Sequence, residues 1–172
     1  HWISGYNDAK SIDCLCLGTG RFLRSVLVPS LIEAKLKPAL IQTRGYNFME
    51  YMKTRRDGTY EVDTVLPSGE VETSKVPCYA AFSLGSAEGK AALIDFLSSQ
   101  TQTLQIKVIG VGVTEAGLAN SQTQAMQELF LLLEYLRVHS LYSSDLSVID
   151  MDNVPDNGDT IRSHMLDLCG PD

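Results

Sequence analysis

Residues 11–37, SIDCLCLGTGRFLRSVLVPSLIEAKLK, decide the fold of this chain. Residues 12–17 form a short, mostly apolar run that predicts a buried strand, which ends at a turn formed by Gly18, Thr19 and Gly20. Beyond the turn, apolar side chains recur at helical spacing: Phe22, Leu23, Val26, Leu27 and Leu31. The chain is therefore expected to pass from a strand, through the glycine turn, directly into a helix.

A glycine turn between a strand and a helix is a typical site for an anion. The first turn of a helix has N–H groups without intrahelical partners, and the helix dipole favours negative charge there. Gly18 permits the tight turn, and Gly20 lets a phosphate approach the backbone without a Cβ in the way. The dinucleotide fingerprint G-x-G-x-x-G is incomplete, however, because Leu23 takes its third glycine position. The stretch by itself fits phosphate binding and an ordinary strand-to-helix turn equally well.

Composition excludes several classes of partner. The 172 residues, 44% hydrophobic and 20% charged, suit one globular domain with its own core. A formal net charge of −7 argues against nucleic acid or an anionic membrane as the main partner. No apolar run reaches the roughly 18 residues that a transmembrane helix needs. We therefore expect a soluble domain with no nucleic-acid partner and no transmembrane segment.

The cysteines and the first residue bear on the compartment. Cys14, Cys16, Cys78 and Cys169 show no spacing typical of a zinc site, so no metal is expected, and free buried thiols indicate a reducing compartment. The chain begins with His1 rather than Met. Either a targeting peptide was removed or the chain is a piece of a longer one, so we expect the cytoplasm or an organelle interior such as a plastid or mitochondrion.

Strands and helices alternate along the rest of the chain. A second apolar strand is expected at residues 39–42, after Pro38 ends the first helix, and a short helix at 46–57. Further helices are predicted at 86–99, 123–138 and 160–168, and strands at 107–113 and 146–151. This alternation predicts a Rossmann-like α/β fold, a mostly parallel sheet flanked by helices. It gives a single Rossmann-like domain over residues 11–172, preceded by an N-terminal arm at residues 1–10.

A hairpin insertion is expected at about residues 58–78. Residues 59–66 and 70–77 alternate apolar and polar side chains on either side of Pro67-Ser68-Gly69, which is a β-hairpin signal. We expect an antiparallel insertion on the edge of the main sheet. The alternative is a disordered acidic loop.

Polar residues follow each predicted parallel strand, where such sheets bind their ligands. The strand ends are Gly18-Thr19-Gly20, Gln42-Thr43-Arg44, Thr114-Glu115 and Asp152-Asn153. Their convergence at one end of the sheet favours nucleotide binding.

Three segments resemble the N-terminal domain of the mannitol dehydrogenase family, the long-chain polyol and hexuronate oxidoreductases. They are LGTGRFLR at residues 17–24, VTEAGL at 113–118 and MDNVPDNGD at 151–159, in the family's order and with comparable spacing. The resemblance covers nearly the whole chain, although residues 46–84 match loosely. It implies an NAD(P)-binding Rossmann domain that serves hydride transfer between a sugar alcohol and its keto form.

The resemblance also implies roles for single residues. The turn with Gly18, Thr19 and Gly20, followed by Phe22 and Arg24, matches the family's cofactor turn. Thr114 and Glu115 match the strand end near the nicotinamide. Asn153 matches an asparagine that helps to hold the reacting oxygen of the substrate, although Asn and Asp here also suit a capped turn.

Two departures from the family pattern matter. The family's catalytic lysine, with its asparagine and histidine partners, lies in a C-terminal helical domain that this chain lacks, so we expect no turnover of a polyol by this chain alone. The carboxylate expected after the second strand for the ribose 2′-hydroxyl is also missing. Arg44 stands there, where it would either pair with a 2′-phosphate and favour NADP over NAD, or remain a solvated surface residue.

Two functions lead, and a regulatory nucleotide sensor that uses the same site without chemistry ranks after them. The first is the cofactor-binding part of a polyol or uronate dehydrogenase that works with a catalytic domain. The second is a noncatalytic Rossmann-fold subunit of a larger protein assembly, which the missing third glycine and the missing ribose carboxylate favour. The expected partners are accordingly a catalytic domain or other protein subunits.

Overall fold

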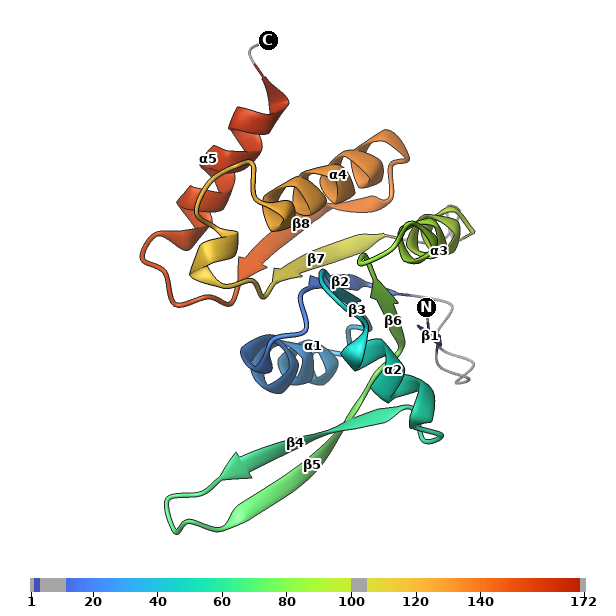
Figure 1. Ribbon diagram of the computed structural model, residues 1–172, viewed down its shortest axis with the longest axis vertical. Helices are drawn as coiled ribbons and strands as arrows, with labels where there is room; N and C mark the ends of the chain where they lie inside the picture. The colour runs from blue at the N-terminus through green and yellow to red at the C-terminus, as the bar shows by residue number, and fades with distance from the viewer. Residues whose placement is uncertain (1, 4–11, 100–104, 171–172) are drawn as a thin grey trace.

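The computed structural model describes residues 2–3, 12–99 and 105–170, which form a mixed α/β fold with two separate sheets (Figure 1). The main sheet contains six strands in the order β1-β6-β3-β2-β7-β8. The pairs formed among β6, β3, β2, β7 and β8 are parallel, and β1 pairs antiparallel with β6. The strands are β1 (Trp2–Ile3), β2 (Cys14–Leu17), β3 (Pro38–Gln42), β6 (Ala80–Ser83), β7 (Ile106–Val111) and β8 (Tyr142–Asp150).

The strand order contains the reversal that defines a doubly wound sheet. From the central strand β2 the chain moves outward to β3 and β6, and then returns to the other side of β2 to continue with β7 and β8. The predicted Rossmann-like α/β class is confirmed. In sheets of this kind, ligands bind beyond the carboxyl ends of the strands at the reversal, which here lies between β2 and β7.

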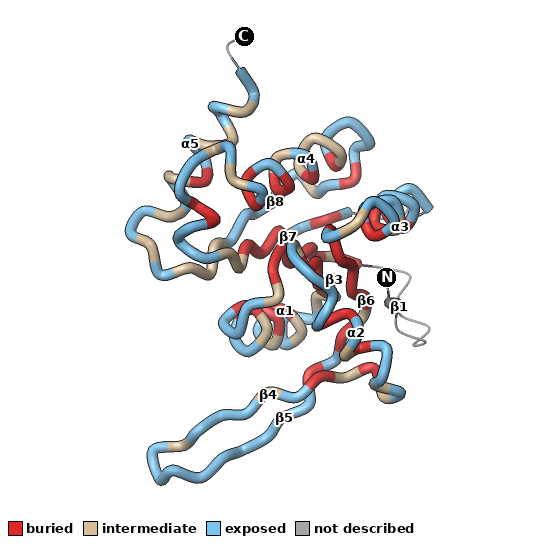
Figure 2. Tube along the Cα trace, viewed as in Figure 1, coloured by how far each residue is buried: buried red, intermediate tan, exposed pale blue. Residues whose placement is uncertain are grey.

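Helices cover both faces of the main sheet (Figure 1). One face carries the helix after the glycine turn, which contains a π-helical turn at Leu23–Leu27 and continues as α1 (Val28–Glu33), and also α2 (Asn47–Thr54). The other face carries α3 (Ala87–Ser98), α4 (Gln124–Val138) and α5 (Asn157–Cys169). Between these layers β2, β3 and β6 are buried on both sides, as Figure 2 shows for the centre of the sheet.

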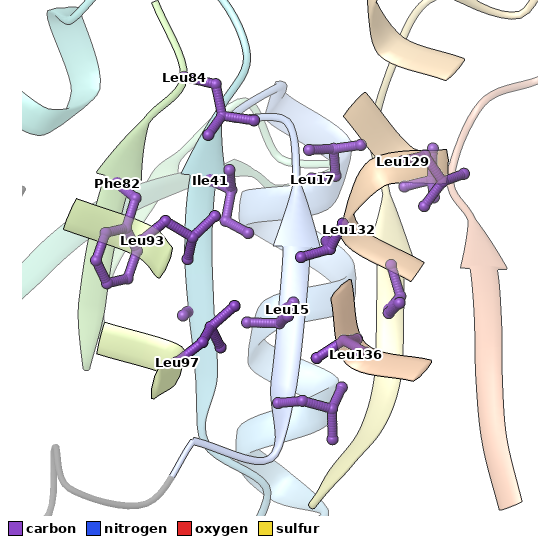
Figure 3. Packing of buried hydrophobic residues seen from close by; sticks show 14 of the residues in the cluster. Leu15, Leu17, Ile41, Phe82, Leu84, Leu93, Leu97, Leu129, Leu132 and Leu136 are labelled. Atoms are coloured by element: carbon purple, nitrogen blue, oxygen red, sulfur yellow. The ribbon is translucent and has the colours of Figure 1, made fainter. Parts of the chain in front are cut away.

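Each face of the sheet has its own apolar cluster. On the side of α3 and α4, helix leucines such as Leu93 and Leu132 pack onto strand residues including Leu15 (Figure 3). Cys14 and Cys16 alternate with the strand leucines and belong to the opposite cluster, under α1 and α2. The two thiols therefore share one buried face, as their spacing predicts.

The helix after the glycine turn packs closely on β7 because two glycines leave room for its leucines. A Cβ on Gly112 would lie 2.6 Å from Leu23 Cδ1, and a Cβ on Gly110 would lie 2.5 Å from Leu27 Cδ2. In the dinucleotide fingerprint the third glycine, on the helix, permits this close approach. Here Gly112, directly after β7, provides the space, which explains how Leu23 is accommodated at that position.

The predicted hairpin exists, but its predicted attachment is wrong. β4 (Thr59–Val65) and β5 (Val71–Pro77) form a two-stranded antiparallel sheet of their own, and β1 occupies the edge of the main sheet beyond β6. Apolar side chains of the hairpin are buried near its base, at Tyr60 and Val76, and Val62 packs partly buried against the same cluster. The exposed strands project from the body of the molecule (Figures 1 and 2).

The sequence patterns miss two strands of the main sheet. β6 is a run of only four residues, AAFS, and it is buried on both faces, so it shows no alternation. β1 lies inside the predicted N-terminal arm, where it extends the sheet beyond β6. The remainder of that arm lies outside the described residues.

Candidate functional site

The glycine turn after β2 is fixed by contacts with both neighbouring strands. The Gly18 N–H donates to the Ile41 carbonyl at 2.8 Å, and Gly18 has a φ of +110°. A Cβ on Gly18 would collide with the carbonyl oxygen of Gly112. Both the backbone conformation and the space therefore require glycine at this position.

Gly20 has a different role, because it leaves the start of the helix open. The nearest atom to a Cβ built on Gly20 would be the Gly112 carbonyl oxygen at 3.6 Å, an ordinary contact. The Gly20 carbonyl accepts the Arg24 N–H at 3.1 Å, so Gly20 is the N-cap of the continuous helical segment 21–33. The exposed Gly20 thus gives open access to a helix N-terminus at the end of the central strand.

A polar cavity of about 410 Å³ lies beside this turn, at the ends of β2 and β3. It is lined by Thr19, Arg24, Gln42, Asn47, Phe48, Tyr51 and Glu61. A second cavity of about 400 Å³ shares Arg24 and Glu61 with the first and continues along the hairpin. Together the two cavities form a groove between the glycine turn and β4, which we call the turn–hairpin groove.

Arg24 is held in the groove by contacts of both its side chain and its backbone. Its Nε donates to the Thr19 carbonyl at 2.9 Å, and its guanidinium lies 5.2 Å from the centre of the Phe48 ring. Its own carbonyl accepts a hydrogen bond from the Tyr60 hydroxyl at 2.6 Å. The positive charge is therefore fixed next to the glycine turn, where it would favour an anionic ligand. Phe22, predicted to belong to the same turn, is 70% exposed and lines neither cavity.

The side chains of Gln42 and Arg44, at the end of β3, interact with the loop after the strand and with α4, respectively. Both ends of the buried Gln42 amide are engaged, since Nε2 donates to the Arg44 carbonyl at 2.8 Å and Oε1 accepts the Phe48 N–H at 3.2 Å. The Arg44 side chain is exposed and lines neither cavity of the groove. Arg44 instead lies near enough to Glu128 on α4 to lower the pKa of that carboxyl, against the larger opposite effect of burial.

The other predicted site residues lie on the far side of β2 from the groove. The strand ends are in register there, because Gly112 N–H donates to the Leu17 carbonyl at 2.7 Å and Met151 N–H to the Val111 carbonyl at 2.8 Å. Thr114 precedes the short helical turn Glu115–Gly117, and Asn153 follows β8. The side chains of Thr114, Glu115 and Asn153 are all exposed at this end of the sheet.

Two buried carboxylate oxygens lie at the end of β8. Asp150 Oδ2 and Asp152 Oδ2 have no hydrogen-bond partner among the described residues, and burial raises the pKa of Asp150. Asp152 Oδ1 accepts the Asn153 N–H at 2.9 Å, and the Asp152 carbonyl accepts from the Asn157 amide at 2.9 Å. The segment DNVPDN is thus a turn closed by its own side chains, as well as the site of Asn153.

The structure adds groove residues that the sequence interpretation misses. Asn47, Phe48 and Tyr51 come from the start of α2, and Glu61 comes from the hairpin. The aromatic residues of the segment 46–57 were a signal for Phe48 and Tyr51, but Asn47 gave none. No signal in the sequence identifies Glu61, because the alternation of a hairpin does not indicate which other parts of the chain its exposed face lies against.

Neither protein-family models nor curated proteins match this chain. Within the described ranges, no helix has the length and apolar character needed to cross a membrane. In the same ranges, no three His, Cys, Asp or Glu side chains are grouped so that they could hold a metal ion.

Proposed function

We propose that this chain is the NAD(P)-binding domain of a mannitol dehydrogenase-like polyol or uronate oxidoreductase, and that it does not catalyse hydride transfer alone. The observation that carries the proposal is the open N-cap at Gly20, which adjoins a polar cavity at the ends of β2 and β3. Rossmann domains bind the pyrophosphate of a dinucleotide at this helix N-terminus and its adenosine ribose at the ends of the first two strands.

The residues of the groove fit a dinucleotide. Gly20 leaves room for a phosphate at the first-turn N–H groups, and the Arg24 guanidinium adds positive charge beside them. Tyr51, which is partly exposed in the cavity, offers aromatic surface to the adenosine. NAD or NADP would supply the hydride chemistry, while this chain binds and orients it.

The nicotinamide, the reacting end of the dinucleotide, would lie on the side of β2 away from the groove. Thr114 and Glu115 follow β7, the strand next to the glycine turn, and therefore suit the nicotinamide side. The Asn153 amide can donate a hydrogen bond to a substrate oxygen whose negative charge increases during hydride transfer. The family's catalytic lysine would have to come from a further domain of the same chain or from a partner subunit.

A second candidate function, a noncatalytic subunit of a protein assembly, is favoured by the apolar surface around β8 and α5. Val148 on β8 is 42% exposed and Leu166 on α5 is 57% exposed, and both line a largely apolar cavity of about 290 Å³. Such surface is typical of contacts between proteins or domains. The same surface would also suit a catalytic domain, so cofactor binding has to separate the two functions.

Calorimetric titration with NADH and NADPH tests the proposal, on the wild-type chain and on Gly20→Ala and Gly20→Asp. Saturable binding of at least one dinucleotide is expected for the wild type. Gly20→Asp should abolish it, because a carboxylate would occupy the position of the phosphate, although Asp is a good N-cap and should preserve the fold. Gly20→Ala adds a methyl group without charge and should bind more weakly but measurably.

Failure of a folded wild-type chain to bind either dinucleotide would overturn the proposal and leave the noncatalytic subunit. Circular dichroism of each variant shows whether the fold is retained. Unchanged binding in Gly20→Asp would also contradict it, since the glycine turn would then not be the binding site.

A further inference from the structure

The cavity at the ends of β2 and β3 occupies the position where a Rossmann domain binds the adenosine ribose. Thr19 belongs to the first turn of the βαβ unit and Gln42 to the end of its second strand, and both line the cavity. At this place a carboxylate normally accepts hydrogen bonds from the ribose hydroxyls and so selects NAD, whereas an arginine accommodates the 2′-phosphate of NADP.

The end of β3 supplies neither group. The Gln42 amide is used on both sides by the backbone of its own loop, with bonds to the Arg44 carbonyl and the Phe48 N–H. Arg44 does not line the cavity. A ribose at this position must therefore find its specific partner on another element.

The hairpin provides a carboxylate at this place. Of the residues that line the cavity, Glu61 on β4 is the one with a carboxylate, and it lines the adjoining cavity as well. Its Oε1 accepts a hydrogen bond from Arg55 Nη2 at 2.8 Å. Arg55 is itself fixed, since its Nε donates to the Thr59 carbonyl at 3.2 Å and its guanidinium lies 5.5 Å from the Tyr51 ring centre. Glu61 is thus held in place through Oε1, while Oε2 has no hydrogen bond to a described residue and is left to accept from a ligand.

We infer that Glu61 binds the adenosine ribose hydroxyls, so that the hairpin, and not the end of β3, makes this domain select NAD(H) over NADP(H). The inference rests on the proposed function. A carboxylate accepts hydrogen bonds from a vicinal diol but repels a phosphate in the same place. The neighbouring Arg24 does not reverse this choice, because its Nε bond to the Thr19 carbonyl directs the guanidinium to the glycine turn and hence to the pyrophosphate.

Titration of four chains with both dinucleotides tests the inference: wild type, Glu61→Gln, Glu72→Gln and Arg44→Ala. Glu61→Gln keeps an oxygen for Arg55 but removes the charge. Glu72→Gln makes the same change on β5, at a residue that lines neither cavity of the groove. Arg44→Ala tests the alternative that Arg44 binds the 2′-phosphate and selects NADP.

The wild type should bind NADH more tightly than NADPH. Glu61→Gln should weaken NADH binding by about tenfold, the loss of a hydrogen bond to a charged group, and should leave NADPH binding equal or tighter. Glu72→Gln and Arg44→Ala should match the wild type with both ligands.

Three results would overturn the inference while the proposed function survives. They are tighter binding of NADPH by the wild type, unchanged NADH affinity in Glu61→Gln, and an equal loss in Glu72→Gln. If the wild type binds neither dinucleotide, the proposed function fails and this inference fails with it.

Discussion

At the scale of single residues, Gly18 and Gly20 of the turn have different roles. Gly18 is required by the fold, because its φ of +110° and its contact with the Gly112 carbonyl both exclude a side chain. Gly20 is not required by the fold, because its surroundings admit a Cβ, and in the proposed function it leaves room for the phosphate. Substitutions at the two positions should therefore affect different measurements.

We expect Gly18→Ala to lower the free energy of unfolding by at least about 2 kcal/mol, through backbone strain and steric conflict with β7. Gly20→Ala should change it by less than about 1 kcal/mol, since it removes only a modest N-cap preference. Urea denaturation followed by circular dichroism measures both. Equal losses of unfolding free energy in the two variants would contradict the different roles assigned to the two glycines.

The sequence predicts part of the candidate site at this scale. Gly18, Thr19, Gly20 and Arg24 lie where the motif places them, since a strand followed at once by a helix leaves the turn little freedom. Arg44 does not reach the groove, because the loop after β3 is folded around the Gln42 amide. Glu61 is close in space but comes from a separate sheet, and no local pattern carries that information.

At the scale of elements, the central contact is that between the helix after the glycine turn and β7. Leu23 and Leu27 project from the helix into spaces left by Gly112 and Gly110. The space that the fingerprint provides with a glycine on the helix is thus provided on the strand. The absence of the third glycine is accordingly no argument against a close helix–strand contact in this chain.

A double-mutant cycle tests whether Gly112 provides the space for Leu23. Gly112→Ala should destabilise the protein by about 1–3 kcal/mol through overpacking, and Leu23→Ala by about 2–5 kcal/mol through the cavity that it leaves. The double variant should be more stable than the sum predicts by at least about 0.5 kcal/mol, because the new methyl group enters the space vacated by Leu23.

Leu93 serves as the control partner, since it packs on the opposite face of the sheet. Gly112→Ala combined with Leu93→Ala should be additive. Additivity in the Leu23 cycle as well would show that the two residues do not share one space.

Elements with strong periodicity are predicted well, and those without it are missed. The helix expected at 123–138 is observed as Gln124–Val138, because its apolar stripe is long. β6 is missed because four residues buried on both faces show no period. β8 begins at Tyr142, four residues before the expected start, because its first part is polar and lies at a register shift against β7.

At the scale of the whole molecule, the two core layers determine which cysteines can react. Cys14, Cys16 and Cys78 are buried under the α1 and α2 face, whereas Cys169 is exposed at the end of α5. Burial raises the pKa of Cys14 and of Cys78 to about 12 and raises that of Cys16 as well. These three thiols are therefore both inaccessible and protonated at neutral pH.

Thiol labelling of the native protein at pH 8 should modify one cysteine rapidly, and Cys169→Ser should remove that fast phase. The remaining thiols should react only when urea unfolds the chain, and raising the pH to 9 should not release them. Mass spectrometry of the labelled peptides identifies the sites. Rapid labelling of Cys14 or Cys16 in the folded protein would contradict the described core.

The turn–hairpin groove has its two sides in different sheets, since the glycine turn follows β2 and the opposite side is β4. Near the base, Tyr60 and Val76 tie the hairpin to the core, while most of the residues beyond them face solvent. Over evolutionary time, the residues of β4 that line this groove can change without disturbing the packing that maintains the glycine turn on its other side. The molecule thus separates the part that must stay constant from the part that is able to diversify.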